Sequence, residues 1–339
     1  MYILDRFQSA AVGRPFEVKD RDWDDRDASD NAEEDRLQVE LTRLAQILGD
    51  ICQDIYHRRT ISTQAASALA RRLQQWSDNL LPHMTVNSLL DDITTSSDIR
   101  QALLRLHLSH LHAVILLSRP FFFYVVATAV TNRPAGSASP AETTRGTVAR
   151  LARACVLAAT KSVELIQTVF RDIVSPSRPP FLINFIFQVG IILLLEAYRD
   201  RSFLRSASIT GVKVLMRSYI HVDLTAKRTY HIFEDMEIAI RDEEDKRQSL
   251  EARDILADLL GGSVGPADGR HPSQPLRDTT SPGSLGLSQV LLDGAHMSTN
   301  VDGGDAVNFD FDSLAYWDSM AAGGHWDFGG MLFNAEIPL

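Results

Sequence analysis

The stretch over residues 99–124 constrains the fold of this chain more than any other segment, because it is a long apolar helix pattern interrupted by proline. It reads IRQALLRLHLSHLHAVILLSRPFFFY, and its apolar residues recur at intervals of three and four. That spacing predicts one face of an α-helix packed on a core. Pro120 lacks a backbone N–H, so we expect the helix to end or kink near Ser118 and Arg119. We assign Arg119, Pro120 and the phenylalanines after them to packing, with Arg119 capping helix carbonyls at the break.

The same spacing recurs along most of the chain and predicts an all-α fold, a multi-helix bundle. Further helices are expected over 35–57, 62–80, 143–170, 181–197, 204–220 and 223–260, with Ser62 as an N-cap. The first of them carries a stripe of six apolar residues with heptad spacing: Leu37, Leu41, Leu44, Leu48, Ile51 and Ile55. We interpret this heptad stripe as part of the bundle core, while a coiled-coil homodimer through it stays open. No segment shows the alternation of a strand.

The composition changes at Gly261 and divides the chain. Thirteen of the nineteen glycines lie in 261–339, together with ten acidic and two basic residues. Such a segment buries too little apolar surface to offset the entropy of ordering it, so we expect a disordered tail. We therefore divide the chain into an extended acidic segment, 1–34, a helical domain, 35–260, and a disordered acidic-aromatic tail, 261–339.

The tail contains the candidate partner-binding residues. Its sequence NFDFDSLAYW over 308–317 mixes aromatic residues and leucine with aspartate. Acidic neighbours keep apolar side chains solvated and available to a groove on another protein. We expect contacts with a coactivator to come from five residues: Phe309, Phe311, Leu314, Tyr316 and Trp317. The alternative is a tail that only keeps the chain soluble.

No constellation in the sequence points to metal or catalytic chemistry. On a helix, His107 and His110 share a face while His112 points elsewhere, and no carboxylate is matched to them. We interpret all three as polar positions on a partly exposed helix. The acidic run over 20–30 lacks the last aspartate of a magnesium-binding DDxxD motif. With no phosphate loop, nucleophile elbow or dinucleotide fingerprint in the sequence, we expect neither a cofactor nor an enzymatic activity.

Charge, cysteine content and hydropathy further limit the classes of protein to which this chain can belong. The net charge is −10 and no part of the chain is strongly basic, so the electrostatic signature of nucleic-acid binding is missing. The two cysteines, Cys52 and Cys155, are too far apart for a disulfide framework and suit a reducing compartment. The strongest membrane candidate, 181–197, has 17 residues and three polar interruptions, below the ~20 apolar residues of a spanning helix. We interpret it as a buried core helix and expect no membrane association.

Four motifs resemble the fungal-specific transcription factor domain, the middle homology region that follows the zinc binuclear cluster in fungal transcription factors. They are GRP at 13–15, the helix sequence at 41–59, a W…LP pattern at 76–82, and LHL at 106–108 leading to RPF at 119–121. The last is similar to the family's LHL…LLxRPF signature and is the strongest match. The four motifs follow the family's order over about residues 5–130.

This resemblance implies a helical regulatory domain that acts in the nucleus on transcription, through coactivators or other regulatory proteins, with a small-molecule effector as a further family property. Family members bind DNA through six closely spaced cysteines, and this sequence has none in that arrangement. Zinc binding and direct DNA binding are therefore not expected of this chain. The family domain begins upstream of its GRP segment, so we expect Met1 to lie inside the domain. An all-α enzyme or a membrane-associated accessory protein is the alternative from another class.

Overall fold

The structure confirms the all-α class for the residues that it describes. The computed structural model describes residues 2–12, 16–18, 33–56, 60–91, 96–131, 142–171, 180–259 and 306–308. Up to residue 91 the structure contains α1 (Tyr2–Val12), α2 (Glu33–Ile51), the π-helix η3 (Cys52–Tyr56), β1 (Thr60–Ser62), α3 (Thr63–Asp78), the 3₁₀ helix η4 (Pro82–Met84) and α4 (Val86–Asp91). From residue 97 on it contains α5 (Ser97–Thr131), α6 (Glu142–Arg171), α7 (Pro180–Arg199), the 3₁₀ helix η5 (Arg201–Arg205), α8 (Ala207–Arg217), α9 (Leu224–Leu259) and β2 (Ala306–Asn308).

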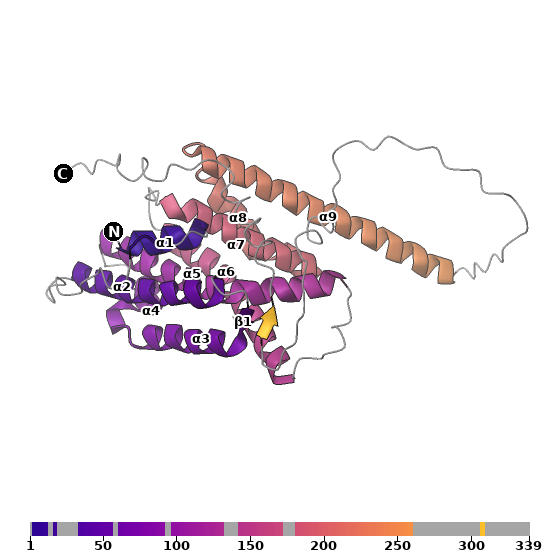
Figure 1. Ribbon diagram of the computed structural model, residues 1–339. Coiled ribbons are helices and arrows are strands. Elements are labelled where there is room, and N and C mark those ends of the chain that lie inside the picture. Colours follow the sequence, from indigo (N-terminus) through magenta and orange to yellow (C-terminus); the bar gives the residue numbers. More distant parts are fainter. Residues whose placement is uncertain are drawn as a thin grey trace, which may run out of the picture.

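The helices pack around two central helices, α5 and α7. Helix α5 contacts α2, α3 and α4 and packs along α6. Helix α7 packs on α6, and both α8 and α9 pack on α7 (Figure 1). The buried apolar side chains of these helices form one continuous core cluster. The long final helix predicted over 223–260 is α9.

The heptad stripe lies in this core. All six of its side chains are buried within the chain, including those of Ile51 and Ile55 at the junction of α2 and η3. The core interpretation is therefore confirmed, and the stripe has no exposed surface for a second copy. The N-cap is confirmed as well, because Ser62 Oγ accepts a hydrogen bond from the N–H of Ala65 at 3.3 Å.

The first residues of the chain are helical, so the expectation of an extended segment is wrong for Tyr2–Val12. The buried guanidinium of Arg6 lies 4.8 Å from the ring centroid of Tyr2 and 4.0 Å from that of Phe16. Its Nη2 donates to the carbonyl of Val18 at 3.1 Å. Helix α1 is stabilised by a buried arginine that stacks on aromatic rings. Because arginine is not part of an apolar pattern, the sequence did not indicate this helix. The GRP motif and the acidic run over 20–30 lie outside the described residues.

Helix α5 passes through Pro120 and continues to Thr131, so of the two predicted outcomes, an end or a kink near Arg119, the helix end is wrong. In an α-helix the N–H of residue 120 would bond to the carbonyl of Leu116, and proline has no N–H to give. The hydroxyl of Tyr56, at the end of η3, donates to that carbonyl instead, at 2.7 Å. Nε of Arg119 donates to the same Tyr56 hydroxyl at 3.2 Å.

Packing around the motif agrees with the sequence assignment. The side chains of Arg119, Pro120, Phe121 and Phe122 are all buried in the core. The guanidinium carbon of Arg119 lies 5.3 Å from the ring centroid of Tyr56, which adds a cation–π contact to the hydrogen bond. Residues 119–121, which carry the strongest motif of the sequence, are therefore interior residues.

Two three-residue strands pair antiparallel, whereas the sequence led us to expect none. Thr60 pairs with Asn308, Ile61 with Val307, and Ser62 with Ala306. Strands of three residues are too short to show an alternating pattern, so they could not be predicted from the sequence. The rest of the predicted tail lies outside the described residues.

Among the described residues, α5 and α7 each include a segment long and apolar enough to cross a membrane, Ser97–Ala129 and Leu182–Arg199. Their most apolar windows are 61% and 72% buried inside the bundle. Core helices of folded domains have this character, so length and composition alone do not assign a membrane span. The interpretation of 181–197 as a buried core helix is confirmed by the burial of α7.

Candidate partner-binding surface

The five aromatic and leucine residues predicted to bind a partner, Phe309, Phe311, Leu314, Tyr316 and Trp317, lie outside the described residues. The described chain ends with β2 at Asn308, one residue before Phe309. The structure therefore neither brings these residues together nor separates them. They remain a prediction from the sequence.

Histidines 107 and 110 are packed in the bundle, so the interpretation as partly exposed polar positions is wrong for His107. Its Nε2 lies 2.9 Å from the carbonyl oxygen of Met84, and its side chain is buried. The half-buried His110 ring lies 5.0 Å from the ring of Trp76. Burial lowers the pKa of both histidines, that of His110 to about 4. Both rings therefore pack as neutral side chains at pH 7.

His112 is also buried, against the expectation, and it joins three helices. Its ring stacks on Phe7 of α1 at 6.1 Å and meets Phe185 of α7 edge-on at 5.5 Å. Burial, followed by the charge of Arg119, lowers its pKa to about 4. Within the part of the chain that the structure describes, no three His, Cys, Asp or Glu side chains converge as a metal site.

A small pocket lies between α7, η5 and α9, next to Tyr198, Arg201 and Ile240. It has room for about one water molecule, whereas sites for small organic ligands measure about 300–1,000 Å³. The pocket is therefore no binding site for a metabolite-sized effector.

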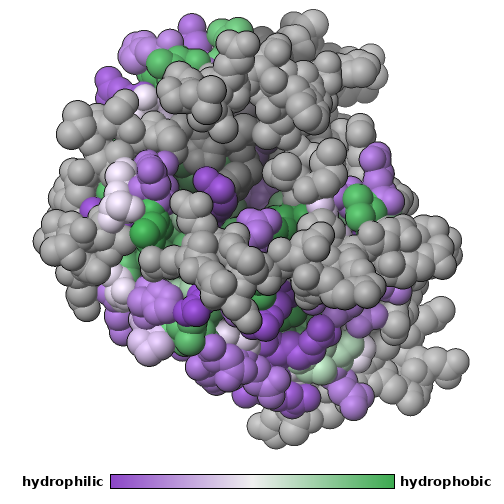
Figure 2. All heavy atoms as spheres, turned by 90° about the vertical axis from the view of Figure 1, so that its left-hand side faces the viewer, coloured by the Kyte–Doolittle hydropathy of each residue, from purple (hydrophilic) through white to green (hydrophobic). Residues whose placement is uncertain are grey.

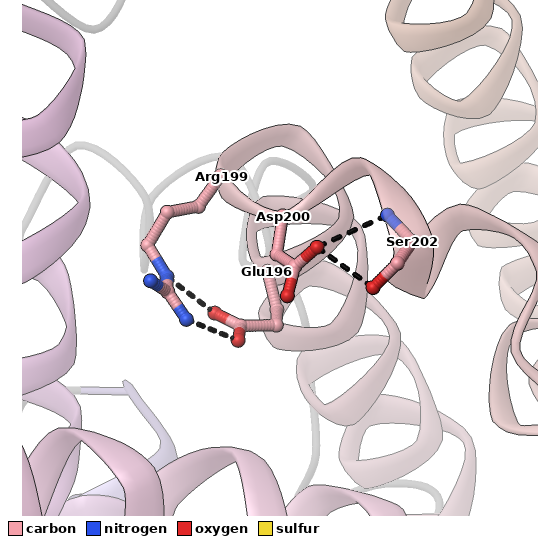
Figure 3. Close-up of polar contacts among 4 residues, drawn as sticks. All are labelled: Glu196, Arg199, Asp200 and Ser202. Carbon is pink, nitrogen blue, oxygen red and sulfur yellow. Dashed lines mark hydrogen bonds and ion pairs between the residues drawn. The ribbon is translucent and has the colours of Figure 1, made fainter.

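The corner between α7 and η5 is fixed by short polar contacts (Figure 3). Glu196 accepts two hydrogen bonds from the guanidinium of Arg199, at 2.8 and 2.5 Å. Asp200 caps η5 by accepting from the N–H of Ser202 at 3.0 Å and from its hydroxyl at 2.8 Å. This corner sets the position of Arg201, the first residue of η5.

Ion pairs then hold α9 against the bundle. Arg201 lies 2.8 Å from Glu244 and 3.7 Å from Glu251, two residues of α9. Closer to the start of α9, the buried Glu237 pairs with Lys213 of α8 at 2.8 Å and with Arg241 at 2.6 Å. Burial raises the pKa of Glu237, but the hydrogen bonds from these two cations outweigh it and hold the pKa below its ordinary value. The contacts thus extend along α9 as far as Glu251.

On both sides of Glu251, α9 carries exposed apolar side chains. The exposed fraction is 60% at Leu250, 59% at Ile255 and 56% at Leu256. In Figure 1 the last turns of α9 reach beyond the other helices. At the opposite end of the bundle, in Figure 2, the described residues are mainly hydrophilic, with hydrophobic atoms in small separate patches. The apolar end of α9 was not singled out from the sequence, because the charged run before it dominates the hydropathy pattern of this helix. The three- and four-residue spacing of its apolar positions is nevertheless present in the sequence.

Comparisons with known proteins identify fungal regulators as relatives. Over 136 residues the chain is 35% identical to Filamentous growth regulator 27 of Candida albicans, a match that covers 37% of this chain and 17% of that protein. Over 144 residues it is 31% identical to Transcriptional activator protein acu-15 of Neurospora crassa, a match that covers 35% of this chain and 15% of that protein. Over 211 residues it is 21% identical to an uncharacterized transcriptional regulatory protein of Schizosaccharomyces pombe, a match that covers 59% of this chain and 25% of that protein. No protein-family model and no solved structure matches the chain.

The matches span 15–25% of the length of these relatives. Their names describe transcriptional regulators or activators and a regulator of filamentous growth, all from fungi. They support a role of this chain in transcription regulation and agree with its resemblance to fungal transcription factors. Proteins of that class usually act in the nucleus, with other regulatory proteins or the transcription machinery as partners.

Proposed function

We propose that this chain is a fungal transcription regulator, with a regulatory domain of the middle homology type over 35–260 and an activation segment in 261–339. The observation that carries the proposal is the similarity to three fungal regulators, two of them above 30% identity. The burial of Arg119, Pro120 and Phe121 adds support, because the motif that resembles the family is built into the core.

Under this proposal the chain acts through other proteins and not by contacting DNA with a zinc cluster of its own. A six-cysteine cluster cannot be built from Cys52 and Cys155, the two cysteines of the sequence. Both are buried, and burial raises the pKa of each thiol to about 12. We propose no cofactor and no enzymatic activity, a nuclear location, and coactivators or other regulatory proteins as partners.

The activation segment is proposed from composition. Residues 308–317 combine four aromatic side chains with aspartates in a region that carries ten acidic and two basic residues. Such segments fold onto apolar grooves of partner proteins when they bind. Phe309, Phe311, Leu314, Tyr316 and Trp317 are the residues proposed to make the contacts.

A reporter assay tests the activation segment. Residues 261–339 are fused to a foreign DNA-binding domain in a fungal host, and transcription of a reporter gene is measured. We expect activation that is lost when the five proposed contact residues are replaced by alanine. The matched control replaces Trp326, Phe328 and Phe333, aromatic residues of the same tail, and should keep most of the activity. Activation no higher than that of the DNA-binding domain alone would refute the activation segment.

A further inference from the structure

The structure points to a second partner-binding surface, at the end of α9. We propose that residues 250–259 dock as an amphipathic helix into an apolar groove, bordered by lysine and arginine side chains, on another protein. The apolar positions of this helix are Ala252, Ile255, Leu256 and Leu259, which we call the α9 end face. The inference goes beyond the activation segment and does not depend on the tail residues.

The α9 end face has the spacing of helices that bind in grooves. Its positions follow one another as i, i+3, i+4 and i+7, which places them on one side of an α-helix. The side chains of Ile255 and Leu256 are more than half exposed, whereas Phe233 and Ile240, earlier in the same helix, are buried in the core. Exposed large apolar side chains gathered on one helix face are typical of a surface that another molecule covers.

The end of α9 is helical in the structure, which contains no partner. Arg201 pairs with Glu244 at 2.8 Å and with Glu251 at 3.7 Å, and Glu251 immediately precedes the α9 end face. These ion pairs fix the preceding turns of α9 to η5 while the last turns extend beyond the bundle (Figure 1). A helix that is already formed loses less conformational entropy on docking than a disordered segment does.

Charge argues against the chain's own tail and against a membrane as the occupant. Residues 250–259 carry the acidic side chains Glu251, Asp254 and Asp258 and the basic Arg253, a net charge of −2. The tail, with ten acidic and two basic residues, carries −8 and is repelled by this helix end. Helices that lie on membranes are rich in lysine and arginine on their polar face, and this one is not.

Size and charge together argue against a second copy of the chain. A stable dimer needs about 800 Å² of buried surface per partner, far more than two helical turns offer to a facing helix. Two copies of this segment would also place acidic borders against each other. A groove surrounds the helix and buries several of its sides, and a basic border complements its charge. The observations therefore favour a groove on a different protein.

Photocrosslinking of the full chain tests this proposal. A benzophenone side chain is placed at position 256, and in a matched control at position 250, which is equally exposed but lies on another side of α9. The chain is expressed in a fungal host, irradiated, and its adducts are mapped to the peptide by mass spectrometry. We expect an adduct from position 256 alone, in an apolar segment of another protein with lysine or arginine beside it. Ile255→Glu should weaken this adduct about tenfold, and Leu250→Glu should leave it unchanged.

Every other result overturns the proposal. Crosslinks to a second copy, to residues 261–339, to lipid or to a surface without apolar and basic residues identify a different occupant. The absence of an adduct, or equal adducts from both positions, removes the docking surface. Ile255→Glu should unfold at the same denaturant concentration as the unmodified chain, since the side chain is exposed. The reporter fusion of 261–339 lacks α9, so the two proposals can fail independently.

Discussion

The hydroxyl of Tyr56 lies 2.7 Å from the carbonyl oxygen of Leu116 and donates a hydrogen bond to it. That carbonyl is the one that Pro120 leaves without a donor inside α5. The same hydroxyl accepts a hydrogen bond from Nε of Arg119 at 3.2 Å. The π-helix η3 therefore supplies the donor that proline removes, and α5 continues through its proline.

Removing the hydroxyl of Tyr56 should destabilise the chain. Tyr56→Phe leaves the carbonyl of Leu116 without this donor and takes an acceptor from Arg119, at positions with little access to water. A buried polar group that loses its partner costs about 1–3 kcal/mol, and we expect that decrease in the free energy of unfolding. Urea denaturation followed by circular dichroism measures it.

Tyr219 provides the matched control. Its side chain is buried like a core residue, burial raises its pKa to about 12, and no described residue hydrogen-bonds its hydroxyl. Tyr219→Phe removes a buried hydroxyl that makes no bond, so stability should stay the same or increase. Equal losses in the two variants would contradict the role given to the Tyr56 hydrogen bonds.

Replacing the proline should make the hydroxyl of Tyr56 less important. Pro120→Ala restores an N–H that can bond to Leu116 within the helix, so the variant should be at least as stable as the natural chain. In that background Tyr56→Phe should cost about 1 kcal/mol less than it does alone. A double-mutant cycle measures the difference, and additive effects of the two substitutions would contradict the proposed relationship.

The contact between α7, α8 and α9 depends on a glycine. A Cβ at Gly190 would lie 2.7 Å from Cε2 of Phe233 and 3.0 Å from Cγ1 of Val212. Gly190→Ala should therefore lower the free energy of unfolding by about 1–3 kcal/mol through overpacking. Gly146, near the start of α6, has nothing within 4 Å of such a Cβ, so Gly146→Ala should raise stability by about 0.5–1 kcal/mol. Thermal denaturation of the two variants measures both effects. If both variants were destabilised, the close packing at Gly190 would not explain the loss.

Stability should fall as the pH is lowered from 7 to 5. Burial lowers the pKa of His110 and His112 to about 4 in the folded chain, whereas an unfolded histidine titrates near 6.5. The unfolded state therefore binds more protons between these values, and stability that is complete above pH 6.5 is lost towards pH 4. We expect a loss of roughly 2 kcal/mol per histidine at pH 5. Urea denaturation at both pH values measures it.

The variant His110→Gln tests whether the histidines cause this loss. It removes one of the two groups, so the decrease in the free energy of unfolding between pH 7 and 5 should become about 2 kcal/mol smaller. An unchanged decrease would assign the pH dependence to other groups.

The sequence predicted the features of this fold that depend on local patterns. Heptad spacing identified the buried stripe of α2 and η3, and Ser62 before a helical pattern identified the start of α3. These features are visible because one helix face or one cap involves residues close together in the chain. The continuation of α5 through Pro120 could not be predicted from a local pattern, because the hydrogen-bond donor for the carbonyl of Leu116 is a tyrosine 60 residues away.

Polar residues in the core account for most of the other errors. Arg6 and His112 are buried, yet both are residue types that usually signal a surface. Their burial depends on aromatic partners from other helices or from the chain beyond α1, such as Phe185 and Phe16. The two candidate partner-binding surfaces differ in the same respect. The tail residues were proposed from composition, whereas the exposure of Ile255 and Leu256 could be seen only in the structure.

The most direct test of the proposed function tethers the full chain to a promoter. The 339 residues are fused to a foreign DNA-binding domain in a fungal host, and reporter transcription is compared with that of the same fusion limited to residues 1–260. The account predicts that the full chain raises transcription and that removing 261–339 abolishes the increase. A full-chain fusion that leaves transcription unchanged, while it is folded and present at the promoter, would contradict a role in activation.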